Sequence, residues 1–162
     1  MQLNKSQVKA FLEVMGSDET RHIICTAKID KYNDHTVVVA TNGYVLAALS
    51  APGLAGHEGK HIDRASIIKW YKLATPRDQL DESAIIEMLS ETKTEGKYPD
   101  WQLLIRQPPA EAVEKVSLNA NYMLTMQKLS GNVVTYTARG KLGPMISETD
   151  GNVYLVMPIK FS

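Results

Sequence analysis

The sequence predicts an α+β fold in which antiparallel sheets carry helices on one face, and two observations support this. The first is a strong hairpin signal, because two apolar runs meet across Asn42-Gly43. The second is the regular spacing of three helix caps, since Asn4, Asp63 and Asn119 lie 59 and 56 residues apart and each precedes a short amphipathic pattern. Such spacing indicates an internally repeated β-α-β-β-β unit.

Length and composition fit one domain, or one and a half small ones, with a core of its own. The chain has 162 residues, of which 44% are hydrophobic and 22% charged. Lysine plus arginine equal aspartate plus glutamate at 18 each, so no overall basic field points to nucleic acid. A local basic patch is still compatible with this balance.

The N-terminal region and the cysteine content indicate the cellular compartment. Cys25 is the single cysteine and lies in the apolar run 22–27, which predicts a buried strand residue in a reducing environment. Residues 1–5 lack the apolar segment of a signal peptide, and no run approaches the roughly 18 apolar residues of a membrane span. We therefore expect a cytoplasmic protein.

The first repeat begins with a capped helix. Asn4 followed by Gln7 is typical of a capping box, and the apolar spacing predicts a helix over 4–16 that ends at Gly16. An Asn-Gly pair between strands favours a type I′ turn, in which both central residues have positive φ. The elements expected after the helix are a strand over 21–31, a hairpin over 36–50 and a loop over 51–59.

The second and third repeats follow the same order. Strand 61–63 leads into a helix that Asp63 caps and Pro76 stops, and residues 84–89 can form a strand. Asn119 caps a third helix, which ends at Gly131. The remaining expectations are a linker over 108–112, strands over 132–138, 142–148 and 152–161, and a hairpin turn at Asp150-Gly151.

Three separated motifs resemble the bacterial sliding clamps, the β subunits of DNA polymerase III. Residues 154–161 (Tyr-Leu-Val-Met-Pro-Ile-Lys-Phe) resemble the family's C-terminus. Residues 40–47 (Ala-Thr-Asn-Gly-Tyr-Val-Leu-Ala) are similar to Ala-Thr-Asp-Gly-His-Arg-Leu-Ala in its middle domain. Residues 98–101 (Tyr-Pro-Asp-Trp) are similar to Phe-Pro-Asp-Tyr at the junction into its last domain. The motifs occur in the family's order.

The resemblance implies a DNA-clamp-like fold in a shortened form. Residues 1–107 would correspond to the family's middle domain, and residues 108–162 to the second half of its last domain. The first domain and half of another have no counterpart in this sequence.

The resemblance also implies a hydrophobic groove that accepts short linear peptides from polymerases, the clamp loader and repair proteins. A glycine at a hairpin tip allows close backbone approach, and a methionine supplies an adaptable apolar contact. The alternative is that these are plain core residues. Tyr44-Val45 and Leu103 replace polar residues of the family, which makes the groove more apolar. The groove residues that carry over by motif are Thr41, Gly43, Tyr44, Leu46, Pro99, Leu104, Leu155, Val156, Met157, Pro158 and Ile159.

A second implied surface is the set of helices that lines the central hole of a clamp. These helices offer basic side chains to the duplex backbone without reading bases. A solvated polar helix face is the alternative explanation of such charges. The candidate side chains are Lys5, Lys9, Arg64, Lys69, Lys72 and Lys128.

The oligomeric state decides between two functions. A clamp ring contains six domains, or twelve half-units, so four chains of three half-units would close an equivalent ring, with each third unit completing a domain across an interface. The sequence is equally compatible with a monomer or a dimer. Without a ring, the groove could still capture clamp-binding peptides, and the protein would be a decoy or adaptor that regulates replication.

The sequence offers no pattern typical of an enzyme. It contains no phosphate-binding glycine motif and no nucleophile elbow. The four histidines His22, His35, His57 and His61 have no metal-binding spacing. We therefore expect a non-catalytic DNA replication protein, a processivity factor or its derivative, without metal or cofactor.

Overall fold

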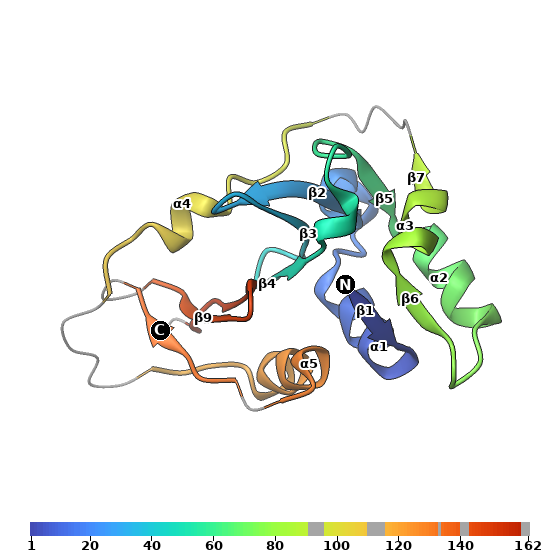
Figure 1. Cartoon of the computed structure of the whole chain (residues 1–162). Coiled ribbons are helices and arrows are strands. Elements are labelled where there is room, and N and C mark those ends of the chain that lie inside the picture. Colours follow the sequence, from blue (N-terminus) through green and yellow to red (C-terminus); the bar gives the residue numbers. More distant parts are fainter. Residues whose placement is uncertain (91–95, 110–115, 133, 140–142, 160–162) are drawn as a thin grey trace.

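The computed structural model describes residues 1–90, 96–109, 116–132, 134–139 and 143–159 (Figure 1). The strands are β1 (Gln2–Asn4), β2 (Thr26–Tyr32), β3 (His35–Thr41), β4 (Val45–Ser50), β5 (His61–Asp63), β6 (Gln79–Asp81), β7 (Leu89–Ser90), β8 (Thr137–Ala138), β9 (Met145–Thr149) and β10 (Asn152–Val156). The helices are α1 (Lys5–Val14), α2 (Arg64–Leu73), α3 (Glu82–Met88), α4 (Gln102–Ile105) and α5 (Ala120–Ser130), with 3₁₀ turns η1 (Glu19–Cys25) and η2 (Pro52–Leu54).

Eight strands form one antiparallel sheet in the order β7-β5-β2-β3-β4-β10-β9-β8. Pairing of β4 with β10 joins the N-terminal and C-terminal parts of the chain into this sheet. Helices α1 and α5 lie on the same side of it (Figure 1). The α+β prediction is therefore confirmed.

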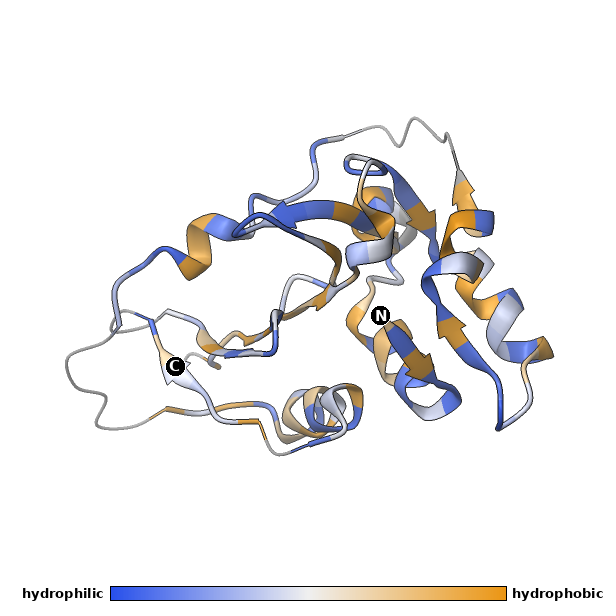
Figure 2. Ribbon diagram, in the orientation of Figure 1, coloured by the Kyte–Doolittle hydropathy of each residue, from blue (hydrophilic) through white to orange (hydrophobic). Residues whose placement is uncertain are grey.

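The sheet has an apolar core on each face, because successive side chains of a strand point to opposite sides. On β3, Val38 and Ala40 pack in the helix-side core, whereas Val37 and Val39 pack in a second cluster on the opposite face. Figure 2 shows that the helices carry both hydrophobic and hydrophilic residues, as amphipathic helices do. Strand β3 is thus buried on both sides.

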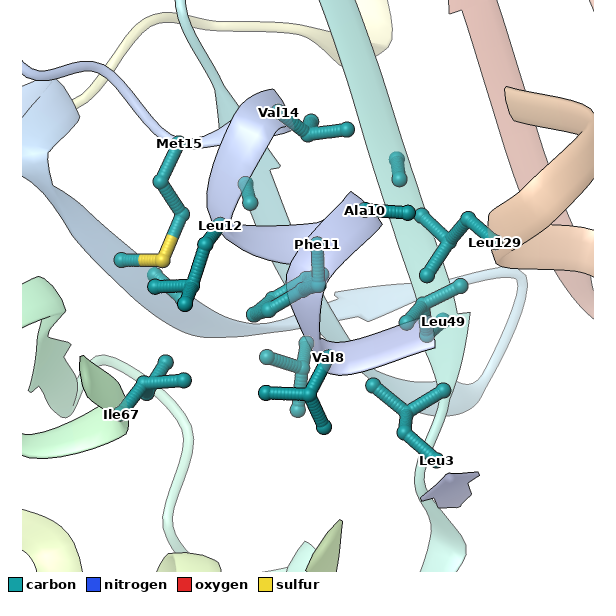
Figure 3. Close-up of a cluster of buried hydrophobic side chains, with 14 of the residues drawn as sticks. Leu3, Val8, Ala10, Phe11, Leu12, Val14, Met15, Leu49, Ile67 and Leu129 are labelled. Carbon is teal, nitrogen blue, oxygen red and sulfur yellow. The ribbon is translucent and has the colours of Figure 1, made fainter. Parts of the chain in front are cut away.

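Helix α1 lies between α5 and α2 in the helix layer. Ala10 of α1 points toward Leu129 of α5, and Leu12 points toward the side on which Ile67 of α2 lies (Figure 3). The predicted capping box is confirmed: the Asn4 side chain accepts from the Gln7 amide, and the Gln7 side chain accepts from the Asn4 amide.

The contacts between the first two repeats are reciprocal. We define unit 1 as β1 to β4, unit 2 as β5 to β7 and unit 3 as α5 to β10. Strand β1 pairs with β6 of unit 2, and β5 pairs with β2 of unit 1. Lys5, the first residue of α1, donates to the Ala74 carbonyl at the end of α2 (2.6 Å), and Arg64, the first residue of α2, donates to the Leu12 carbonyl in α1 (3.4 Å). The first residue of each helix thus donates a hydrogen bond to the other helix or its C-cap.

Only unit 1 shows the complete β-α-β-β-β order among the described residues. In unit 2 the chain passes from β6 into α3, so the strand predicted over 84–89 is wrong. The Asp81 side chain accepts from the Ala84 amide and caps this helix, and Ile85 is the residue of α3 that is buried. The cap and the one-sided burial favour a helix over a strand.

The strand predicted from Arg21 begins later, at Thr26. Residues 19–25 form 3₁₀ turns instead, where the Asp18 side chain accepts from the Thr20 amide. Cys25 lies in this segment and is half-buried, so its assignment as a buried strand residue is wrong.

The type I′ turn predicted at Asn42-Gly43 is also wrong. Thr41 pairs with Leu46, and Gly43 has a φ of +93° while Asn42 has no positive φ. The Asn42 side chain instead accepts from the amides of Tyr44 and Val45. Positive φ at two successive central residues occurs in the turn of residues 33–34 and, as predicted, at Asp150-Gly151.

Unit 3 keeps the predicted capped helix. The Asn119 side chain accepts from the Asn121 amide, and Gly131 ends α5 in the left-handed region with a φ of +74°. The strands β8, β9 and β10 are shorter than predicted. Linker residues 110–112 and the predicted strand positions 133, 142 and 160–161 lie outside the described residues.

Gly16 follows α1 at a close backbone contact. Its amide donates to the Ile24 and Thr41 carbonyls, and an added Cβ would lie 2.8 Å from Ile24 Cγ1. We expect Gly16→Ala to lower the free energy of unfolding by about 1–3 kcal/mol, because a methyl group must be forced into a filled site. Urea denaturation measures the loss. Ser17→Ala, at an exposed neighbour, is the control and should change stability little; equal stability of both variants would contradict the contact.

Candidate functional site

The predicted groove residues converge where β4 meets β10. Leu46 and Leu155 are direct antiparallel partners on these strands, and both are buried in the cluster on the face opposite the helices. Leu104 and Met157 are half-buried and pack against the same cluster. The structure therefore brings together four residues from three segments that lie far apart in the sequence.

The segment that contains α4 covers this sheet face. Tyr98, Trp101 and Ile105 are buried in the cluster. Tyr98 Oη donates to the Val39 carbonyl (3.0 Å), and Trp101 Nε1 donates to Asp30 Oδ2 (3.2 Å). These bonds hold the segment over β2 and β3, so that Leu104 lies at the edge of the cover.

Titratable groups surround the start of this segment. Burial, with a smaller contribution from the nearby Asp30 charge, raises the pKa of Tyr98 far above its usual value, so the phenol stays protonated and donates. Lys28 forms an ion pair with Asp30 (3.1 Å). His61 lies against the Tyr98 ring, and burial followed by the Lys28 charge lowers its pKa. A neutral imidazole is therefore favoured there.

The end of β10 is fixed to the hairpin tip. The Met157 amide donates to the Tyr44 carbonyl (2.8 Å), and the Ile159 amide donates to the Ser117 carbonyl (2.8 Å). Tyr44 is 60% exposed and stacks on Tyr122 of α5, with ring centroids 6.1 Å apart. The backbone of Met157 is thus bonded to the residue that carries the exposed ring of this aromatic pair.

Other predicted groove residues occupy different places. Thr41 is buried, and its Oγ1 donates to the Val45 carbonyl. Val156 lies in the helix-side core, because it follows Leu155 on the strand and points to the other face. Gly43 and Pro99 are exposed and Pro158 is half-buried, while Ile159 is 51% exposed.

Some residues of this region could not be assigned to the site from the sequence. Ile23 is half-buried against the same cluster as Leu46, and the Arg21 guanidinium lies 3.4 Å from where a Cβ on Gly43 would be. Both residues precede β2 in η1, which was predicted as a strand. Tyr122 gives no local sign that it stacks on Tyr44.

The predicted DNA-facing residues divide into two groups. Lys5 and Arg64 bond carbonyls within the chain, and Lys5 also lies over the Tyr71 ring. The others are exposed on three helices. They are Lys9 of α1, Lys69 and Lys72 of α2, and Lys128 of α5. Glu13, which accepts from Thr125 Oγ1, places a carboxylate on the exposed side of α1.

The part of the chain that the structure describes groups no three histidine, cysteine, aspartate or glutamate residues as a metal site would need. Within the same part, every helix is too short or too polar to cross a bilayer.

The fold matches solved structures over the whole chain. The DNA polymerase sliding clamp of Bacillus subtilis matches with a TM-score of 0.65 at 14% identity, covering 100% of this chain and 64% of that one. This chain has the sliding-clamp fold. The DNA polymerase III β subunit of Borrelia burgdorferi, solved with a natural product, matches with a TM-score of 0.64 at 9% identity, covering 100% of this chain and 64% of that one.

A third clamp extends the comparison. The DnaN sliding clamp of Bartonella birtlesii, bound to griselimycin, matches with a TM-score of 0.59 at 16% identity, covering 99% of this chain and 66% of that one. The chain thus spans 64–66% of the length of these clamps. No protein-family model matches the chain, and no curated protein matches its sequence. At 9–16% identity these matches establish the fold, which is the clamp-like fold that the sequence motifs predicted.

Proposed function

We propose that this protein is a non-catalytic, cytoplasmic clamp-like processivity factor that binds linear clamp-binding peptides of polymerases, clamp loaders or repair proteins. In this proposal residues 1–107 act as the middle clamp domain and residues 108–162 as half of the last. The observation that carries it is the convergence of Leu46, Leu104, Leu155 and Met157 where β4 pairs with β10. Buried leucines form the floor, and the half-buried Leu104 and Met157 form an apolar rim.

The rim has the chemistry that an aliphatic peptide anchor needs. Each aliphatic side chain buried against it would contribute roughly 1.5–3 kcal/mol. The hydrogen bond from the Met157 amide to the Tyr44 carbonyl fixes the backbone on one side of the site. Peptide binding would therefore cost little conformational entropy of the protein. A fluorescent clamp-binding peptide titrated against the protein tests this step, and absence of saturable binding would overturn it.

Encirclement of duplex DNA by an assembly of four chains is the second part of the proposal. Four exposed lysines on α1, α2 and α5 would face the phosphates: Lys9, Lys69, Lys72 and Lys128. The decoy is the alternative function, and one observation favours it. Lys5 and Arg64 are engaged within the chain, and Glu13 lies among the remaining charges, which leaves few cations for DNA.

Salt dependence separates these two functions. Each lysine that contacts a phosphate should add about 0.9 to the slope of log affinity against log salt. We expect glutamine at all four exposed helix lysines to flatten that slope, measured by fluorescence anisotropy with a duplex. Lys31→Gln with Lys60→Gln, at exposed positions outside these helices, is the control. If the wild-type protein shows no salt-dependent DNA binding, the decoy function stands instead.

A further inference from the structure

Units 1 and 2 provide a template for how two units complete a domain. In each, the first residue of the helix reaches across to the other helix: Lys5 to Ala74 and Arg64 to Leu12. Counted from the caps Asn4 and Asp63, these contacts use the first, eighth and eleventh positions, and Val8 and Ile67 occupy the fourth. Val8 and Ile67 are both buried.

Unit 3 presents the same positions without a partner unit in the described chain. Its open α5 face, which we define as Ala120, Met123, Gln127 and Ser130, occupies the first, fourth, eighth and eleventh positions after Asn119. Ala120 and Gln127 are exposed, and Met123 and Ser130 are half-buried. Helix α5 packs on α1 elsewhere, where Thr125 bonds Glu13 and the Leu129 carbonyl accepts from Gln7.

Two further features accompany this open face. A shallow hollow runs beside it, lined by Leu124, Gln127, Lys128, Gly131 and Asn132. Among the described residues, β8 is the last strand of the large sheet; it pairs with β9, and Arg139 beyond it forms a bridge with Pro109. In units 1 and 2 the strand after each helix instead pairs with the strand that precedes the other helix. Unit 3 thus has half of a domain.

The geometry points to a second copy of this chain as the occupant of the open α5 face, with unit 3 docked against unit 3 about a twofold axis. The inference rests on the proposed ring and names the surface through which its chains first meet. A self-complementary contact is the usual form of a homodimer. Units 1 and 2 show that helices of this fold contact one another at these positions and that strands pair across the same boundary.

The distribution of charged residues favours the open α5 face over the outer side of α2 as the contact surface. The four residues of the open α5 face are uncharged, and Lys128, which lines the hollow, lies beside that face and not on it. The outer side of α2 is the alternative, with Leu73 76% exposed, but Lys69 lies one turn away on the same side and would approach its own copy. A dimer through α5 holds six units, and two such dimers would supply the twelve of a ring.

A matched pair of variants tests the contact. In the Arg64–Leu12 contact of the template the first position faces the eighth, so Ala120→Glu with Gln127→Glu would place carboxylates opposite carboxylates in a contact of that kind. Ala120→Lys with Gln127→Glu places a cation opposite each carboxylate. Both positions are exposed, so the fold should be unaffected. We expect the first variant to raise the dimer dissociation constant about tenfold or more, and the second to keep or lower it.

Light scattering on a size-exclusion column across protein concentrations measures the assembly, and circular dichroism checks the fold. Equal dissociation constants for the two variants would overturn the contact, as would a wild-type protein that stays monomeric. If Leu73→Glu dissociates the dimer and the α5 variants do not, the interface lies on α2 instead. Peptide titration of the same samples is independent of assembly, so failure of the α5 contact is distinguishable from failure of the peptide site.

Discussion

Met157→Asp is expected to weaken binding of a clamp-binding peptide about 10- to 100-fold while the fold is retained. Met157 is half-buried at the rim, where its side chain packs against the Leu46 and Leu155 cluster. A carboxylate there removes an apolar contact worth roughly 1.5–3 kcal/mol and remains solvated in the unbound protein. Isothermal calorimetry or anisotropy with the peptide measures the change.

Leu155→Asp should behave differently, because Leu155 is 2% exposed within the same cluster. Burying an unpaired carboxylate in an apolar site destabilises a protein by more than the 2–5 kcal/mol typical of a Leu→Ala cavity. We therefore use Met157 for the binding test. Leu73→Asp is the matched control, since Leu73 is an exposed hydrophobic residue on α2. Unchanged peptide affinity in Met157→Asp, or an equal loss in the control, would argue against the groove.

The sequence predicts what local interactions determine. The capping box of Asn4 and Gln7 closes within four residues, and the helix that it begins is found as expected. Helix α3 shows the opposite case. The apolar run 84–89 is too short for its period to separate strand from helix, and the Asp81 cap decides the outcome.

The candidate site depends on contacts across the whole chain. Leu46 and Leu155 become neighbours only when β4 pairs with β10, and no local pattern determines that register. The resemblance to clamps identified the motifs at residues 40–47 and 154–161, but it did not show to which face of the sheet each of their side chains points. Strand alternation could have separated Leu155 from Val156, because adjacent residues point to opposite faces. No pattern signals the contributions of Ile23 and Tyr122, since both arise from tertiary packing.

Trp101→Ala is expected to lower the free energy of unfolding by about 3–5 kcal/mol, measured by urea denaturation. The substitution leaves a cavity between the α4 segment and the sheet face opposite the helices. Trp101 is 2% exposed, packs against the tilted Tyr32 ring with ring centroids 5.3 Å apart, and donates to Asp30. Trp101→Phe keeps most of the volume but loses that donor, so its cost should be smaller.

Peptide binding gives Trp101 a second readout. Leu104 lies in the α4 segment that Trp101 anchors, so loss of the anchor should displace one side of the apolar rim. At temperatures where Trp101→Ala is still folded, we expect its peptide affinity to fall while Trp70→Ala, at a half-buried site on α2, leaves affinity unchanged. Full affinity in a folded Trp101→Ala protein would show that the rim does not depend on α4, and Met157 with Tyr44 would then have to form the site alone.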